Sequence, residues 1–204
     1  MRARSLGIIA LGLLIAAVPI PSLSASAEAQ DEEYAVYAAL LSARWSGEDK
    51  SPFVIQAETS DAGHFHSDNF DQTAEFLRKE FKEREPSIAL TDELESFRRV
   101  RNSAVRLDPG KLGLPNAKVV PSAEIDPIFE SPGLENSWAK FREHFGGAWG
   151  IVRLSRVGFN ADRSRAILSV SGSCGPLCGS GDYVVLEKKS GKWRVLGRVM
   201  AWIS

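Results

Sequence analysis

The two cysteines of the chain, Cys174 and Cys178, are separated by three residues in a glycine-rich segment, residues 172–181. Thiols at this separation in a turn that bends freely can reach bonding distance, and disulfides persist in oxidising compartments. We therefore expect a disulfide between them. Because so short a loop constrains the unfolded chain only a little, the expected stabilisation is about 2 kcal/mol.

The same segment resembles a thioredoxin-like redox site, because Cys174 is followed by Gly175 and Pro176. The spacing is C-x3-C instead of C-x2-C, however, and no helix is expected after it to lower the pKa of a thiolate. The spacing and the expected position between two strands favour a structural disulfide. A thiol-disulfide enzyme is kept as an alternative.

One cluster of potential metal ligands occurs, with His64 and His66 on alternate residues and Asp61 and Asp68 on either side. Alternate residues of an extended segment point the same way, so both imidazoles can face one ion. This alternative would support metal-assisted hydrolysis. An exposed loop before a helix explains the same residues, and we predict that no metal is held tightly there.

The last predicted strand, residues 193–203, offers a candidate binding surface. Strict alternation places Arg194, Arg198 and Trp202 on one side of the strand, and Arg and Trp are enriched at interface hot spots. The other side is the expected core. A simpler interpretation is that this side of the strand is exposed to water or covered by the amino-terminal helices.

The sequence lacks the specific motifs of catalytic nucleophiles and of nucleotide-binding loops. It contains no G-x-S-x-G, G-x-x-x-x-G-K-[ST] or G-x-G-x-x-G pattern. Twenty-five Lys and Arg against 26 Asp and Glu give a net charge of -1, so no positive excess draws the chain to nucleic acid. We expect no cofactor and no nucleic-acid partner.

Residues 1–27 have the pattern of a secretory signal. Two arginines, Arg2 and Arg4, precede an apolar run, and the stretch ends in Ala25-Ser26-Ala27. Pro19 and Pro21 stop the run short of the roughly 20 residues that a spanning helix needs. The sequence therefore predicts cleavage after Ala27, export to the periplasm or the medium, and no stable membrane insertion of the remaining chain.

Residues 28–204 are predicted to form a single α+β domain. Helical periodicity indicates helices over residues 31–45, 69–84 and 134–145, and a further helix that begins after Thr91, with Asn69 and Thr91 as N-caps. Short strands are expected at residues 53–58 and 118–120, in an otherwise loop-rich middle. Four further strands follow residue 149, joined by short connections, and the last connection, Lys189-Ser190-Gly191, predicts a tight hairpin. We expect the helices to pack on one face of a C-terminal antiparallel meander.

Several segments of the last third carry a family resemblance. They read S-R-V-G-F-N at residues 155–160, C-G-P-L-C-G-S-G at residues 174–181 and G-K-W at residues 191–193. The chain is similar in this pattern to exported bacterial proteins of unknown function, which implies export and no particular activity. It also resembles helix-then-meander folds such as the nuclear-transport-factor-2-like cone, a likeness that transfers no site.

These observations predict an exported domain that binds an envelope protein or a small ligand without catalysis. An enzyme using either the cysteines or the histidines, and a structural envelope component, are the alternatives. A concave site with convergent polar groups beside one of these clusters would favour chemistry.

Overall fold

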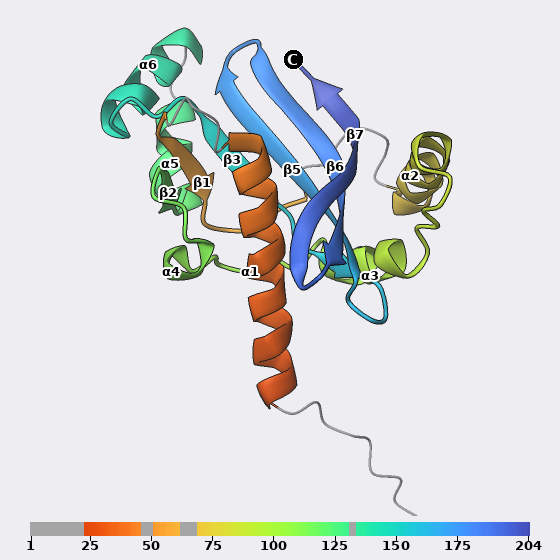
Figure 1. Cartoon of the computed structure of the whole chain (residues 1–204). Coiled ribbons are helices and arrows are strands. Elements are labelled where there is room, and N and C mark those ends of the chain that lie inside the picture. The colour runs from red at the N-terminus through yellow and green to blue at the C-terminus, as the bar shows by residue number, and fades with distance from the viewer. Residues whose placement is uncertain (1–22, 46–50, 62–68, 131–133) are drawn as a thin grey trace, which may run out of the picture.

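The computed structural model describes residues 23–45, 51–61, 69–130 and 134–204. Within these ranges the chain forms six helices and one seven-stranded sheet (Figure 1). The helices are α1 (Leu23–Trp45), α2 (Phe70–Arg84), α3 (Asp92–Val100), α4 (Pro109–Leu112), α5 (Ser122–Phe129) and α6 (Leu134–His144). The strands are β1 (Phe53–Gln56), β2 (Ala117–Val120), β3 (Ile151–Leu154), β4 (Gly158–Phe159), β5 (Arg165–Gly175), β6 (Cys178–Lys189) and β7 (Lys192–Ile203).

The sheet confirms the α+β class and the antiparallel arrangement of the C-terminal strands. Its order is β2-β1-β3-β5-β6-β7, with β4 paired to β5. From β3 to β7 all neighbours are antiparallel, whereas β1 lies parallel to both β2 and β3, so the sheet as a whole is mixed. The β6–β7 turn at Ser190 and Gly191 has positive φ at both residues, as the predicted tight hairpin requires.

The helices pack on both faces of the sheet, which corrects the expectation of one covered face. Leu168 of β5 and Val184 of β6 belong to a core cluster with α1, which crosses in front of the strands (Figure 1). Their neighbours Ile167 and Val185 pack with α2 and α3 instead. Side chains alternate along a strand, so these two groups lie on opposite sides. Unbroken apolar runs in β5 and β6 are typical of strands covered twice.

A third cluster extends the core under α5 and α6, where Val54 of β1 and Ile151 of β3 meet Trp138 and Phe141. The helix α5, like α4, lies in the segment predicted to be loop-rich. Pro127 inside α5 reads as a helix breaker in the sequence. The helix forms because tertiary contacts stabilise its start and bury Ile125 completely.

Two predicted helix starts differ in how they are capped. The side chain of Asn69 accepts a hydrogen bond from the backbone N–H of Asp71 at 3.0 Å, confirming the cap of α2. Thr91 precedes α3 as expected but makes no side-chain capping bond.

Helix α1 begins at Leu23, eight residues before the predicted start, and so runs across the predicted cleavage point after Ala27. Residues 1–22 of the predicted signal lie outside the described residues, and the cleavage stays a prediction.

Candidate functional site

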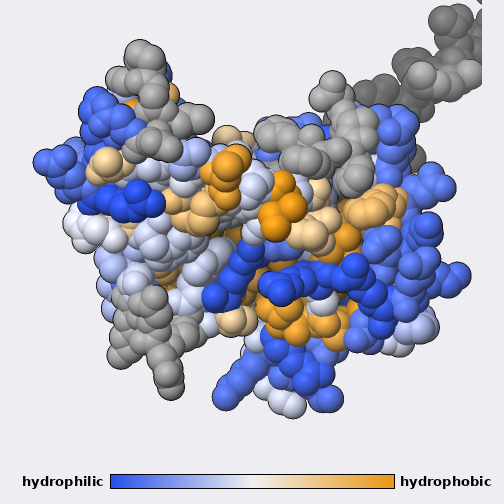
Figure 2. All heavy atoms as spheres, turned by 90° about the horizontal axis from the view of Figure 1, so that it is seen from above, coloured by the Kyte–Doolittle hydropathy of each residue, from blue (hydrophilic) through white to orange (hydrophobic). Residues whose placement is uncertain are grey.

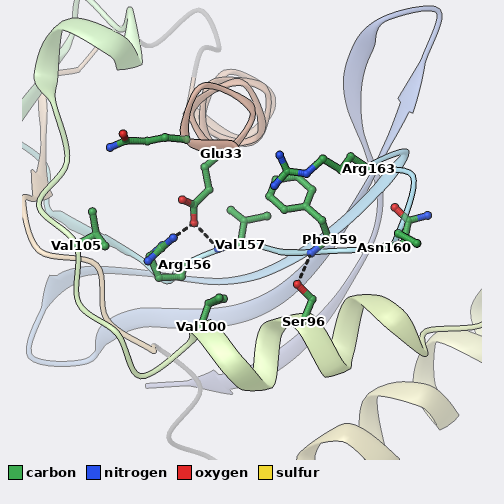
Figure 3. Close-up of a pocket in the computed structure, with 11 residues that line it drawn as sticks. Glu33, Ser96, Val100, Val105, Arg156, Val157, Phe159, Asn160 and Arg163 are labelled. Atoms are coloured by element: carbon green, nitrogen blue, oxygen red, sulfur yellow. Dashed lines mark hydrogen bonds and ion pairs between the residues drawn. The ribbon is translucent and has the colours of Figure 1, made fainter. Parts of the chain in front are cut away.

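A pocket of about 510 Å³ lies where α1, α3 and the segment from β3 to β5 meet (Figure 3). Its charged side chains come from Glu33 of α1 and from Arg156 and Arg163 of the β3–β5 segment. Val100 and Val105 contribute an apolar wall. A concave site that combines an apolar wall with a few charged groups is the usual form of a small-molecule site.

Glu33 is held as a buried carboxylate, with only 6% of the residue exposed. Its Oε1 accepts hydrogen bonds from Arg156 Nε at 2.8 Å and from the backbone N–H of Val157 at 2.8 Å. Tyr37, one helical turn further along α1, has its hydroxyl 3.4 Å from the same oxygen and donates to the Ser155 carbonyl at 2.8 Å. Burial and the neighbouring Glu33 charge raise the pKa of Tyr37, so its hydroxyl stays a donor.

Arg156 forms the ion pair with Glu33 at the pocket. Burial by itself lowers the pKa of Arg156, but the hydrogen bond and the charge of Glu33 outweigh burial and raise it. Its Nη1 also lies 3.3 Å from Ser103 Oγ. In the part of the chain that the structure describes, neither Glu33 Oε2 nor Arg156 Nη2 makes a hydrogen bond. One acceptor and one donor of this pair therefore remain available to a ligand.

The opposite side of the pocket is formed by the turn after β4. Arg163 has a positive φ of 55°, and its guanidinium carbon lies 4.6 Å from the ring centroid of Phe159 (Figure 3). The backbone N–H of Phe159 donates to Ser96 Oγ of α3 at 3.1 Å. The cation–π contact and this hydrogen bond fix a second guanidinium at the rim of the pocket.

A close contact between β4 and α3 holds this wall in place. A Cβ on Gly158 would lie 2.5 Å from the Glu93 carbonyl oxygen and 2.5 Å from the backbone N of Phe97. Only glycine fits such an approach of two backbones. The segment S-R-V-G-F-N, noted above for its resemblance alone, therefore forms one wall of the pocket.

The cysteine segment is a hairpin end, not the flexible loop that its glycines predicted. β5 and β6 stay paired as far as Gly175 and Cys178, and Pro176 and Leu177 alone form the turn. The predicted disulfide between Cys174 and Cys178 is present, with the two Cα atoms 5.1 Å apart. It links the two strands beside the turn, and the chain continues into a strand and not a helix after Cys178, as expected.

The three candidate binding residues of the last strand do not share a surface. Arg194 pairs with Glu187 and Arg198 with Val184, and directly paired residues point to the same side of a sheet. Glu187 and Val184 differ by three positions, so Arg194 and Arg198 lie on opposite sides. A β-bulge between their partners, where the register shifts at Val185/Leu186, breaks the alternation on which the prediction depended.

Each of these residues also has a local contact. Arg194 forms an ion pair with Glu187, and the Arg198 carbonyl accepts from Arg84 of α2. Trp202 covers Gly181, where a Cβ would lie 2.0 Å from the indole Nε1. The binding role assigned to this strand stays untested.

His64 and His66 lie outside the described residues. Among the residues that are described, no group of three or more His, Cys, Asp or Glu side chains is placed to hold a metal ion. Asp61, the described neighbour of the histidines, instead pairs with Arg101 and accepts a hydrogen bond from Ser169 Oγ at 3.0 Å. In the same ranges no helix has the length and apolar character needed to cross a membrane.

Comparison with known proteins leaves the site to be interpreted from its geometry. No family model, curated protein or solved structure matches the chain. The resemblances stated for the last third of the sequence therefore stay predictions.

Sequence reasoning did not single out Glu33, Arg156 or Arg163. Glu33 and Arg156 are 123 residues apart, so no local pattern joins them. The available signal was the segment at residues 155–160, in which Arg156 is the single charged residue.

Proposed function

We propose that the protein is an exported binding domain that holds a small zwitterionic molecule, an amino acid or short peptide, in the pocket at Glu33 and Arg156. The proposal is supported by one observation above all. A fixed carboxylate and a fixed guanidinium stand side by side at the pocket, each with one hydrogen-bonding atom that no described residue uses.

The chemistry of the two groups selects the ligand. A ligand ammonium can donate to Glu33 Oε2, and a ligand carboxylate can accept from Arg156 Nη2 or from Arg163. Charge-assisted hydrogen bonds of this kind are the stronger ones in proteins. The valines of the wall suit an apolar side chain, and about 510 Å³ leaves room for one or two residues. Because the ion pair already exists without ligand, little side-chain ordering opposes binding.

Export is supported by the signal-like residues 1–27 and by the disulfide, which is compatible with an oxidising compartment. The periplasm or the extracellular medium would supply amino acids and peptides as free solutes.

Calorimetric titration with L-leucine and L-leucyl-L-leucine tests the proposal. We expect at least one of them to bind, and we expect both L-leucinamide and N-acetyl-L-leucine to bind at least tenfold more weakly than L-leucine. A hydrogen bond to a charged group contributes about 1.5–3 kcal/mol, and tenfold corresponds to about 1.4 kcal/mol. Absence of binding by both probes, or equal binding of L-leucine and its blocked analogues, would contradict the zwitterion site.

A further inference from the structure

Arg153 of β3 is a largely buried arginine whose side chain hydrogen-bonds to a neutral residue and not to a carboxylate. Its Nε donates to Gln56 Oε1 of β1 at 2.8 Å, and within the described residues it forms no ion pair. Arg44, Arg101 and Arg156, which are also largely buried, each contact a carboxylate instead. Burial lowers the pKa of Arg153, and the charge of Asp126 offsets this only in part. A desolvated guanidinium without a directly paired carboxylate is costly for a protein to keep.

A second pocket, of about 250 Å³, lies directly against this guanidinium. Phe129 of α5 and Trp138 of α6 form one side, with ring centroids 4.9 Å apart in an edge-to-face contact. Ile151 lies two residues from Arg153 on the same side of β3 and pairs in register with Ser173 of β5. The pocket therefore combines apolar and aromatic walls with a single cationic side chain and the two hydroxyls of Ser173 and Ser204.

The disulfide hairpin closes the remaining side, because Gly175, Pro176 and Cys178 also line this pocket. Arg142 of α6 donates to the Cys174 carbonyl at 2.7 Å, which ties the helix to the hairpin. Figure 2 views the molecule from above, the end to which the hairpin points in Figure 1. Hydrophobic residues form several patches across the middle of this view, with hydrophilic residues between them and along the margins. The exposed Leu177 and Ile203 belong to this end.

We propose that this pocket binds a small carboxylic acid with an apolar or aromatic body. The carboxylate would pair with Arg153, which presents a planar fork that suits it, while the ring would lie against Phe129 and Trp138. A cavity of about 150 Å³ accepts benzene in another protein, so about 250 Å³ accommodates a ring with a carboxylate arm. This site shares none of its lining residues with the Glu33 pocket and stands independently of the function proposed there.

Phenylacetate and its neutral isostere phenylacetamide are the probes. We expect calorimetry to show phenylacetate binding at least tenfold more tightly than phenylacetamide. Replacing the guanidinium in Arg153→Met keeps an apolar stem of similar length and should lower phenylacetate affinity at least tenfold. The matched variant Arg163→Met, in the Glu33 pocket, should leave it unchanged.

A second measurement does not depend on any variant. In the wild-type protein, phenylacetate should shift the backbone amide resonances of Ser173 and Gly175 and leave those of Asn160 and Ala161 in place. Equal binding of the acid and the amide, full affinity in Arg153→Met, shifts confined to the Glu33 pocket, or no binding at millimolar phenylacetate would each overturn the proposal.

Discussion

Glu58 caps the start of helix α5 although it lies 64 residues before Ser122, the first residue of that helix. Its Oε2 accepts hydrogen bonds from Ser122 Oγ at 2.6 Å and from the Ser122 backbone N–H at 2.8 Å, at the beginning of α5. The hydrogen bonds from the Ser122 hydroxyl and backbone lower the pKa of Glu58. The residue before the helix, Pro121, offers no side-chain cap. Glu58 therefore does for α5 what Asn69 does locally for α2.

This cap predicts a pH-dependent loss of stability in Glu58→Gln. A carboxyl whose pKa is lowered by folding stabilises above its ordinary pKa of about 4.3, and the stabilisation is lost as the pH falls through the lowered value. We expect the variant to be about 1 kcal/mol less stable at pH 7 and to approach wild type at strongly acidic pH.

Urea unfolding at both pH values measures this effect. Glu130→Gln, a change at an exposed glutamate at the other end of α5, is the matched control and should have little effect at either pH. Equal destabilisation of Glu58→Gln at pH 7 and at acidic pH would show that its charge plays no part.

At the scale of elements, features that depend on neighbouring residues can be predicted from the sequence. Features that depend on residues far away in the chain cannot. The cap at Asn69 and the turn at Ser190 and Gly191 depend on neighbouring residues, and both were predicted from the sequence. The start of α5 depends on a partner 64 residues away, so the sequence predicts a loop-rich segment where this helix forms. The bulge in β7 is set by pairing with β6, and no pattern within β7 indicates it.

The disulfide hairpin predicts a modest stability change. Replacing both Cys174 and Cys178 by Ser should cost about 2 kcal/mol, because the closed loop is short and removes little entropy from the unfolded chain. The long pairing of β5 with β6 should keep the protein folded. Thermal unfolding of the double variant, compared with that of wild type, measures this change, and failure of the variant to fold would contradict it.

The candidate site could not be predicted from the sequence because, like the start of α5, it depends on residues that lie far apart in the chain. Its carboxylate comes from the first helix, its guanidiniums from the β3–β5 segment and its apolar wall from α3 and the residue Val105. The sequence placed these elements in the fold but could not place them beside one another. The cysteines, in contrast, are close in sequence, and their bond could be predicted directly.

At the scale of the whole molecule, the proposed export predicts a mature chain with a defined first residue. Among the described residues of α1, side-chain hydrogen bonds to the rest of the protein come from Asp31 and later positions. Cleavage after Ala27 would therefore keep them. The intact mass of protein exported by a bacterial host should correspond to a chain that begins at Glu28. Retention of residues 1–27 in the exported protein would contradict the predicted signal.

The pocket at Glu33 gives the molecule its proposed role, and the affinity of Glu33→Gln for L-leucine tests it most directly. The amide keeps an oxygen for Arg156 and Val157 but loses the charge that a ligand ammonium requires. We predict at least a tenfold loss of L-leucine affinity by calorimetry, with little change for N-acetyl-L-leucine. Glu32→Gln, one position away and paired with Lys188, is the control and should bind as wild type does. Unchanged L-leucine affinity in Glu33→Gln would contradict the site.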